Sequence, residues 1–244
     1  MTGVDVQRRA EAVARPTAKV EGAATSSRRA AIARLMSRSA REVPHYYVGT
    51  RVPLATALDW LADRNANLPL RQRVLPAALL LRAVALGAVA VPALNGTWVD
   101  DRFVPSRGVH LGVAVALRDG GLLTPTIADV DTKDLTTVMD DLRDLVTRAR
   151  NGRLRPYELA DASITVTNLG DQGVETVFGV IVPPQVALVG FGAIHDEPWA
   201  EGGLLGVRPV VHASLAADHR ATDGRVGARF LDVVAESLQH PEVL

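Results

Sequence analysis

A histidine between an acid and a base, close to the C-terminus, is the first group in this sequence that could do chemistry. The stretch LAADHRATDGRVGARFL places Asp218, His219 and Arg220 after an apolar run, with Asp223 and Gly224 following. Loops that leave a rigid sheet commonly carry function. An imidazole there can act as a general base, because its unperturbed pKa is ~6.5. Asp223 also fits the N-cap of an amphipathic helix, worth ~1 kcal/mol. The pattern therefore supports catalysis and helix capping together.

Other catalytic templates fit the sequence less well. There is no Gly-x-Ser-x-Gly of a serine hydrolase and no Gly-x4-Gly-Lys-Ser/Thr phosphate loop. The segment GFGAIH lacks the third glycine and the following helix of a dinucleotide-binding motif. With no cysteine, there is neither a thiolate nucleophile nor a thiolate metal ligand.

A metal site is weighed and set aside. The run His195, Asp196, Glu197 could join Asp218 and His219 around an ion, but no local spacing typical of metal ligands supports this. We expect the run to be an exposed polar turn, and no metal. The other histidines are expected to be structural: His45, His110, His212 and His240.

Length and charge limit what such a site could serve. The chain has 244 residues, of which 48% are hydrophobic, and its 27 basic and 27 acidic residues cancel. This predicts a globular protein whose partners are small molecules or proteins rather than nucleic acid or a membrane surface. The absence of cysteine and of an export signal favours the cytoplasm. The apolar segment from Val74 to Leu94 contains Arg82 and is predicted to be a buried helix rather than a membrane span.

The elements that would position the histidine form a mixed α/β pattern. Residues 1–25 are predicted to be a flexible arm, and residues 26–244 a single catalytic domain. The clearest helix, TKDLTTVMDDLRDLVTRARNG, is expected to be capped by Asp131 or Thr132. The remaining elements are predicted from periodicity and turn residues. Helices are expected at 26–43, 57–64, 75–91 and 223–239, a hairpin around 98–104, a turn at 118–121, and strands at 45–54, 109–117, 163–168, 185–194 and 204–216.

The same residues carry a family resemblance. The run DHRATDG matches the Asp-His-Arg-x-x-Asp-Gly signature of dihydrolipoamide acyltransferases, the core components of 2-oxo acid dehydrogenase complexes. Three further stretches resemble the family in the same order: RRAAIARLMSRSAREVPHYYV, VPALNGTW and SITVTNLGDQGVETVFGVIVPPQVALVGFGAI. The resemblance implies an α/β, chloramphenicol acetyltransferase-like two-layer fold, with a mixed β-sheet and flanking helices.

A mechanism follows from this resemblance. It implies that His219 acts as general base on the thiol of coenzyme A, or of dihydrolipoamide in reverse, and that the hydroxyl of Thr167 stabilises the oxyanion. Asp223 would hold the loop and the histidine in place, while Asp218 and Arg220 serve as scaffold. In the family the site lies between subunits of a homotrimer, which can assemble further into a cage. Coenzyme A is the implied cofactor, with no metal.

Two departures from the family pattern affect the predicted partners. About 25 residues precede the resemblance, and the chain has two lysines, Lys19 and Lys133, neither placed to carry a lipoyl group in a lipoyl domain. The lipoyl group would then act in trans, on a lipoyl-bearing protein associated with 2-oxo acid dehydrogenase subunits. In addition, Ala216, Ala217 and Thr222 stand where relatives more often have bulkier residues, which would either widen the pocket or reflect a changed activity.

Two alternatives to this function stay open. One is a stand-alone acyltransferase with a non-lipoyl acceptor, and the other is a non-catalytic trimeric or cage-forming scaffold. The choice among acetyl, branched-chain and succinyl groups also stays open, because it can rest on contacts worth ~1–3 kcal/mol.

Overall fold

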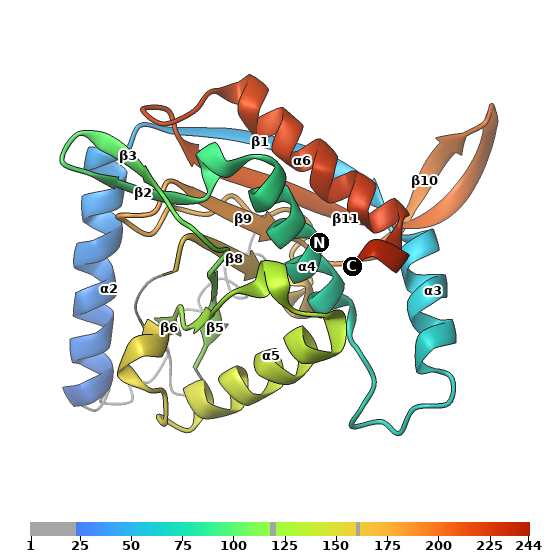
Figure 1. Ribbon diagram of the computed structural model, residues 1–244, viewed down its shortest axis with the longest axis horizontal. Helices are drawn as coiled ribbons and strands as arrows, with labels where there is room; N and C mark the ends of the chain where they lie inside the picture. The colour runs from blue at the N-terminus through green and yellow to red at the C-terminus, as the bar shows by residue number, and fades with distance from the viewer. Residues whose placement is uncertain (1–22, 118–120, 160–161) are drawn as a thin grey trace, which may run out of the picture.

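A mixed sheet built from distant parts of the chain is the frame of the molecule. The computed structural model describes residues 23–117, 121–159 and 162–244 (Figure 1). Within these residues the main sheet has seven strands in the order β1-β11-β9-β8-β4-β7, with β10 paired to β11. Their bounds are β1 His45–Pro53, β4 Leu111–Val113, β7 Thr126–Ile127, β8 Ile164–Asn168, β9 Ala187–Phe191, β10 His195–Glu201 and β11 Leu204–Asp218.

The strand register brings the two ends of the domain together. β1 and β11 pair antiparallel along nine residues, from His45 opposite Asp218 to Pro53 opposite Val210. β9 also pairs antiparallel with β11, whereas β8 runs parallel to both β9 and β4. The residue before His219 is therefore fixed by the first strand.

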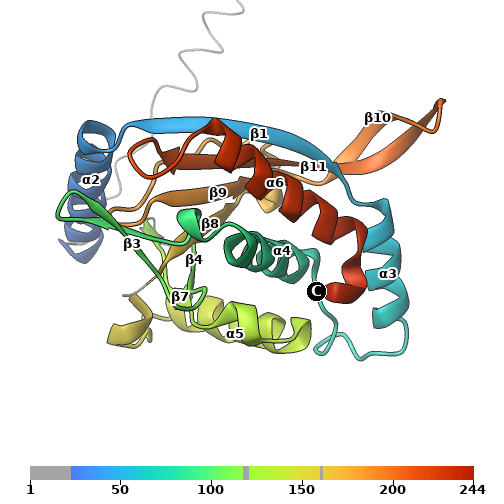
Figure 2. The ribbon, with the colours of Figure 1, turned by 45° about the horizontal axis from the view of Figure 1, so that its top comes forward.

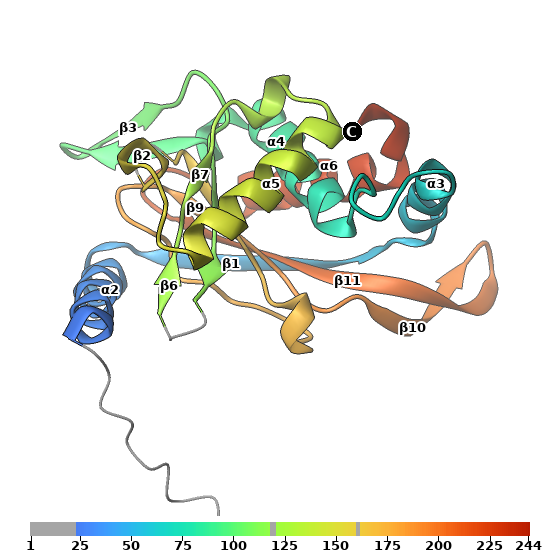
Figure 3. The same ribbon diagram turned by 90° about the horizontal axis from the view of Figure 1, so that it is seen from below.

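Four helices cover one face of this sheet. They are α3 (Ala55–Asn65), α4 (Pro76–Ala90), α5 (Leu135–Arg150) and α6 (Gly224–Gln239). Helix α2 (Ala23–Glu42) stands at one end of the sheet, and the β10–β11 hairpin projects at the other end (Figures 1, 2 and 3). Two small hairpins complete the described part, β2 (Gly96–Val99) with β3 (Arg102–Pro105) and β5 (Val115–Ala116) with β6 (Leu122–Leu123). The predicted α/β class with flanking helices is confirmed.

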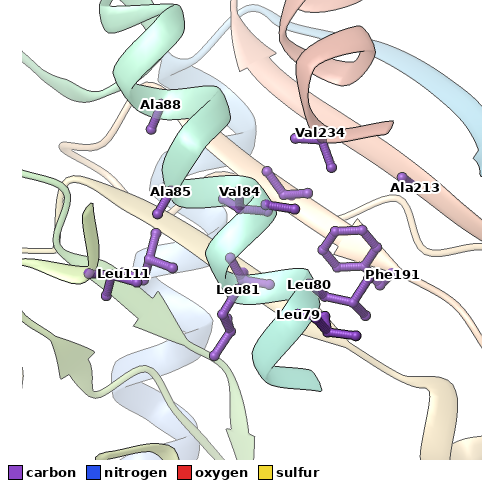
Figure 4. Packing of buried hydrophobic residues seen from close by; sticks show 14 of the residues in the cluster. Leu79, Leu80, Leu81, Val84, Ala85, Ala88, Leu111, Phe191, Ala213 and Val234 are labelled. Atoms are coloured by element: carbon purple, nitrogen blue, oxygen red, sulfur yellow. The ribbon is translucent and has the colours of Figure 1, made fainter. Parts of the chain in front are cut away.

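Helix α4 lies at the centre of the hydrophobic core. Its leucines, valines and alanines pack between the sheet and helices α5 and α6, as Figure 4 shows for Val84 beside Val234. Helix α6 approaches closely at Gly87, where an added Cβ would lie 3.0 Å from both Phe230 and Val234. The prediction of a buried helix here is confirmed. In the described ranges, no helix combines the length and the apolar character needed to cross a bilayer.

An irregular segment between β8 and β9 covers the opposite face of the sheet. Ile181 packs against Leu188 and Ala216 in a second, smaller apolar cluster. Polar groups fasten the same segment: the hydroxyl of Ser39 donates to the Ile181 carbonyl at 2.6 Å, and that of Ser214 donates to the Val177 carbonyl. Both faces are therefore occupied, one by helices and the other by this segment.

Several local predictions need correction. The first helix begins at Ala23 rather than Ser26, so the predicted arm of residues 1–25 lies outside the described residues except for its last three. Helix α5 is capped by Asp134, whose carboxylate accepts from the Thr137 N–H at 2.7 Å. Asp131 and Thr132, the predicted caps, belong to a preceding 3₁₀ turn, and Asp131 accepts instead from the Val109 N–H at 2.9 Å.

Two predicted strand regions also differ from the structure. The strand predicted over 109–117 divides into two, because β4 pairs with β7 and β8 in the main sheet whereas β5 pairs with β6 in a separate hairpin. The turn predicted at 118–121 lies outside the described residues except for Gly121. His195, Asp196 and Glu197, predicted as an exposed turn, form the start of strand β10. That strand pairs with β11.

Candidate active site

The turn between β11 and α6 is fixed by a half-buried ion pair. Asp218 is fully buried, and its carboxylate accepts from the guanidinium of Arg220, with Nη2–Oδ2 at 2.6 Å and Nε–Oδ1 at 3.0 Å. This hydrogen bond raises the pKa of Arg220. The Asp218 carbonyl accepts from the N–H groups of Ala221 and Thr222. The four residues after the strand therefore have little freedom to move.

Three distant segments anchor the same turn. The Asp218 N–H donates to the Val186 carbonyl at 2.9 Å, and the His219 N–H donates to the Pro44 carbonyl at 2.9 Å. The guanidinium of Arg220 lies over the ring of Trp98, 4.9 Å from its centre, which is cation–π geometry. The turn is thus held by the segment before β9, the start of β1 and the β2–β3 hairpin. The arrangement of Asp218 and Arg220 is that of the predicted scaffold.

The side chain of His219 is exposed and rests on a tyrosine. Its ring lies edge-on to the ring of Tyr46, with centroids 5.2 Å apart and planes at 66°. The Tyr46 hydroxyl bonds to the hydroxyl of Thr222 at 3.0 Å, and burial raises the pKa of Tyr46. No described residue forms a hydrogen bond to either ring nitrogen of His219. The imidazole is therefore held by packing, and its nitrogens are available to a ligand.

The tyrosine is a site residue that the sequence did not single out. It lies in β1, opposite Ala217 of β11, so the register places it beside the residue before Asp218. Gly227 of α6 makes room for the ring, since an added Cβ there would lie 3.0 Å from Tyr46 atoms. The sequence contained one signal, the Pro-His-Tyr-Tyr run within a stretch that resembles the family.

Asp223 is the N-cap of α6, as the sequence predicts. Its Oδ1 accepts from the N–H groups of Arg225 at 3.0 Å and Val226 at 3.1 Å. These bonds fix the point at which the loop enters the helix. The structure therefore connects Asp223 to His219 through the backbone of the turn.

Thr167 lies far from His219 within one chain. It is partly buried in β8 and aligned with Gly190 of β9, which is aligned with Ser214 of β11. His219 comes five residues after Ser214, about 16 Å further along the strand, and Thr167 is two strands away, about 10 Å across. The structure therefore does not bring the two predicted catalytic side chains together in one copy.

The acidic and histidine residues of β10 do not join the turn either. His195 is aligned with Val210, and Asp218 lies eight residues further along β11, about 26 Å away. The structure therefore does not form the cluster with Asp218 and His219 that the sequence analysis set aside. His195 and Glu197 lie instead beside Glu175 and His212.

Sequence comparison matches the chain to a known protein family. A sequence model described as 2-oxoacid dehydrogenases acyltransferase (catalytic domain) matches residues 17–244. A similar curated protein is the dihydrolipoyllysine-residue acetyltransferase component of the pyruvate dehydrogenase complex from Rickettsia bellii, 29% identical over 215 residues. The match covers 87% of this chain and 51% of that protein. The chain thus spans about half the length of such relatives.

Solved structures agree with this match. A probable dihydrolipoamide acetyltransferase from Listeria monocytogenes superposes with a TM-score of 0.81 at 25% identity, covering 93% of this chain and 96% of that one. The cubic core of a pyruvate dehydrogenase multienzyme complex gives 0.84 at 25% identity, covering 89% and 90%. A chloramphenicol acetyltransferase gives 0.53 at 16% identity over 84% and 94%, which confirms the predicted fold type.

Proposed function

The chain belongs to the family of 2-oxoacid dehydrogenase acyltransferases, and from this premise we propose that it transfers an acyl group between coenzyme A and a dihydrolipoyl thiol. One observation supports this most directly. The exposed imidazole of His219 has unpartnered ring nitrogens among the described residues, while the Asp218–Arg220 ion pair, two backbone hydrogen bonds and the contact of Arg220 with Trp98 fix the turn that carries it. That is the arrangement a positioned general base requires.

The chemistry is a thioester exchange. His219 accepts the proton from the thiol of coenzyme A, and the thiolate attacks the acyl carbonyl of the dihydrolipoyl thioester. The carbonyl oxygen becomes an oxyanion, to which the Thr167 hydroxyl donates. The intermediate collapses by expelling the dihydrolipoyl thiolate, which takes the proton back from His219. The base contributes about 10²–10⁴-fold in rate and the hydroxyl ~3 kcal/mol.

Two copies of the chain are needed to assemble this site. Because Thr167 and His219 are about 16 Å apart along the sheet and about 10 Å across it, each site takes its base from one copy and its hydroxyl from another. A cyclic homotrimer satisfies this with three equivalent sites. The similarity to the cubic core of a multienzyme complex supports further assembly of such trimers into a cage.

The lipoyl group is proposed to act in trans. Lys133 lies just before α5, where it pairs with Asp141 with Nζ–Oδ2 at 2.7 Å, and it belongs to the catalytic domain rather than to a lipoyl domain. Lys19 lies outside the described residues. We therefore place the lipoyl group on a partner domain, within a complex that contains 2-oxo acid dehydrogenase subunits. The cytoplasmic location of the protein stays a prediction from its composition.

The test follows thiol release from acetyl-coenzyme A, with dihydrolipoamide and a reduced lipoyl domain as alternative acceptors. The wild type should transfer to at least one acceptor, and His219→Ala should be slower by about 10²–10⁴-fold. His240→Ala is the matched control, because His240 is an exposed histidine whose side chain pairs with Glu236 and Glu242 of its own C-terminal segment. Equal rates for His219→Ala and the wild type would refute the mechanism.

Absence of transfer to either acceptor, with succinyl and branched donors as well, would favour the non-lipoyl acceptor or the scaffold. The sedimentation coefficient of the same preparation shows whether the protein forms a trimer. It therefore separates these two hypotheses from a protein that has stayed monomeric. A monomer would be inactive for lack of the second copy, whereas an inactive trimer would refute the proposed acceptors.

A further inference from the structure

A second group of polar side chains lies where the β10–β11 hairpin meets the sheet. Glu175, His195, Glu197 and His212 each offer one ligand atom, and these atoms all lie within 4.8 Å of one another. They come from three segments: the connection between β8 and β9, strand β10 and strand β11. The acyl-transfer chemistry proposed above uses none of them.

The strand register explains why three of the four converge. His195 is aligned with Val210 in β11, and His212 is two residues further along that strand. Glu197 is two residues after His195. Since side chains two apart in a strand point to the same face, His195, Glu197 and His212 share one face.

The segment between β8 and β9 brings the fourth side chain onto that face. The Ala193 N–H donates to the Val174 carbonyl at 2.7 Å. Gly192 allows this approach, because an added Cβ would lie 1.8 Å from the Glu175 carbonyl oxygen. The backbone at Glu175 is therefore fixed, although its side chain is 68% exposed.

The hydrogen bonds of the two histidines turn their Nε2 atoms toward one carboxylate oxygen. Nδ1 of His195 lies 3.1 Å from the Ala193 carbonyl, which only accepts, so Nδ1 carries the hydrogen. Its Nε2 lies 3.0 Å from Oε1 of Glu197. His212 is arranged alike, with Nδ1 3.0 Å from the Thr176 hydroxyl and Nε2 2.8 Å from the same Oε1.

This arrangement calls for a cation. In neutral His195 the Nε2 lone pair faces a carboxylate oxygen, and two acceptors at 3.0 Å need a proton or a metal ion between them. The other oxygen of Glu197, Oε2, accepts from Arg51 at 3.3 Å, so Oε1 is the oxygen that faces the Nε2 atoms of both histidines.

We propose that Glu175, His195, Glu197 and His212 bind a divalent transition-metal ion of the zinc type. Two imidazole nitrogens and two carboxylate oxygens are a ligand set that Zn²⁺ accepts in tetrahedral geometry. Bonds of 2.0–2.2 Å separate such ligands by about 3.3 Å. The Nε2 atom of His212 lies 2.8 Å from Glu197 and 4.0 Å from Glu175, so small side-chain shifts complete the site.

The hydrogen bonds to Nδ1 support the metal over an ordinary ion-pair cluster. Metal-binding histidines almost always donate their second nitrogen to a carbonyl or similar group, which fixes the ring for the ion. Here Nδ1 of His195 donates to the Ala193 carbonyl, and the Thr176 hydroxyl is placed to accept from Nδ1 of His212. A 2+ ion would also balance the charge of the two carboxylates. The bound ion would tie the β10–β11 hairpin to the segment that covers the sheet.

Zinc content and affinity test the site without any measurement of acyl transfer. The purified protein is loaded with ZnCl₂, passed over a desalting column and analysed for metal, and its affinity is measured by competition with a chromophoric chelator. We expect one zinc per chain in the wild type and in the control His240→Ala. Loss of a hydrogen bond that supports a ligand typically lowers metal affinity by about 10–100-fold. In His195→Ala and in the isosteric Glu197→Gln, which each alter a ligand itself, we expect the affinity for zinc to fall by more than this.

Two further readouts guard against a variant that misfolds. Cobalt(II) in the wild type should give the intense visible bands of a four-coordinate ion, and Glu197→Gln should lose them. Zinc should also raise the Tm of the wild type, and the Tm should increase with the logarithm of the zinc concentration, because zinc binds the folded state. Absence of zinc in the loaded wild type, or equal affinity in His195→Ala and His240→Ala, would overturn the proposal.

Discussion

The ring of His219 rests edge-on against the ring of Tyr46, with 5.2 Å between their centroids, and the hydroxyl of Tyr46 is tied to Thr222 at 3.0 Å. A residue of the first strand thereby orients the proposed base at the end of the last strand. Because Tyr46 packs on the imidazole without a hydrogen bond to it, its influence on catalysis should come through position alone.

Substitutions of Tyr46 should separate packing from hydrogen bonding. Tyr46→Phe keeps the ring and loses the bond to Thr222, so it should lower stability by about 1 kcal/mol and leave kcat nearly unchanged. Tyr46→Ala removes the surface under the imidazole and should lower kcat with little effect on KM. Steady-state kinetics on both variants checks this. A loss of kcat in Tyr46→Phe as large as in Tyr46→Ala would show that the hydroxyl acts in the chemistry.

Removal of Arg220 should destabilise the protein strongly. Arg220→Met leaves the carboxylate of Asp218 buried without its partner, which we expect to lower the free energy of unfolding by about 3 kcal/mol. The double variant Asp218→Asn with Arg220→Met should recover part of that loss, because no buried charge remains. Denaturant unfolding of the four proteins in this cycle measures the coupling. Additive losses would mean that the pair is not coupled.

Mixing of two inactive variants should restore activity. His219→Ala and Thr167→Ala each remove one half of every proposed site, so each homotrimer should be slower by about 10²-fold or more. In trimers formed from equal amounts of both, about a quarter of the interfaces combine an intact base with an intact hydroxyl. Co-expressed variants should therefore reach about a quarter of wild-type activity. No gain over the separate variants would place both groups in one chain.

Acid stability should depend on Glu158. Burial raises the pKa of this carboxyl, but the hydrogen bond from Arg148 and the one from the Arg155 N–H lower it overall below its usual 4.5. A folded-state pKa below the unfolded one adds stability that is fully present above pH 4.5 and is lost as the pH falls through the folded-state pKa. Glu158→Gln should remove this part of the pH dependence. Unfolding free energies measured between pH 3 and 7 for both proteins check this, and parallel curves would contradict it.

The helices could be predicted from the sequence because their signals are local. Helix α6 follows from the spacing of its apolar residues and from Asp223, and the structure has that cap. The predicted cap of α5 was wrong because Asp131, Thr132 and Asp134 could each accept a hydrogen bond from the first N–H groups of the helix. Tertiary contact decided among them: Asp131 is engaged by Val109, which leaves Asp134 for the helix.

The two polar clusters show what local patterns cannot convey. The chemistry of the turn could be predicted because Asp218, His219 and Arg220 are adjacent in the chain. The cluster of Glu175, His195, Glu197 and His212, by contrast, joins residues up to 37 positions apart. The pairing of β10 with β11 and the close approach at Gly192 bring them together. The distance between Thr167 and His219 likewise follows only from the order of strands in the sheet.

The pairing of β1 with β11 has a consequence during synthesis of the protein. His45 and Asp218 belong to nearly opposite ends of the domain, so the first strand waits without its partner until the ribosome has made almost the whole chain. Contacts between such distant residues make folding slow, and an unpaired strand edge readily recruits strands of other chains. A chain released before residue 204 would lack β11 altogether. Such a fragment is a substrate for chaperones and proteases rather than a partly working protein.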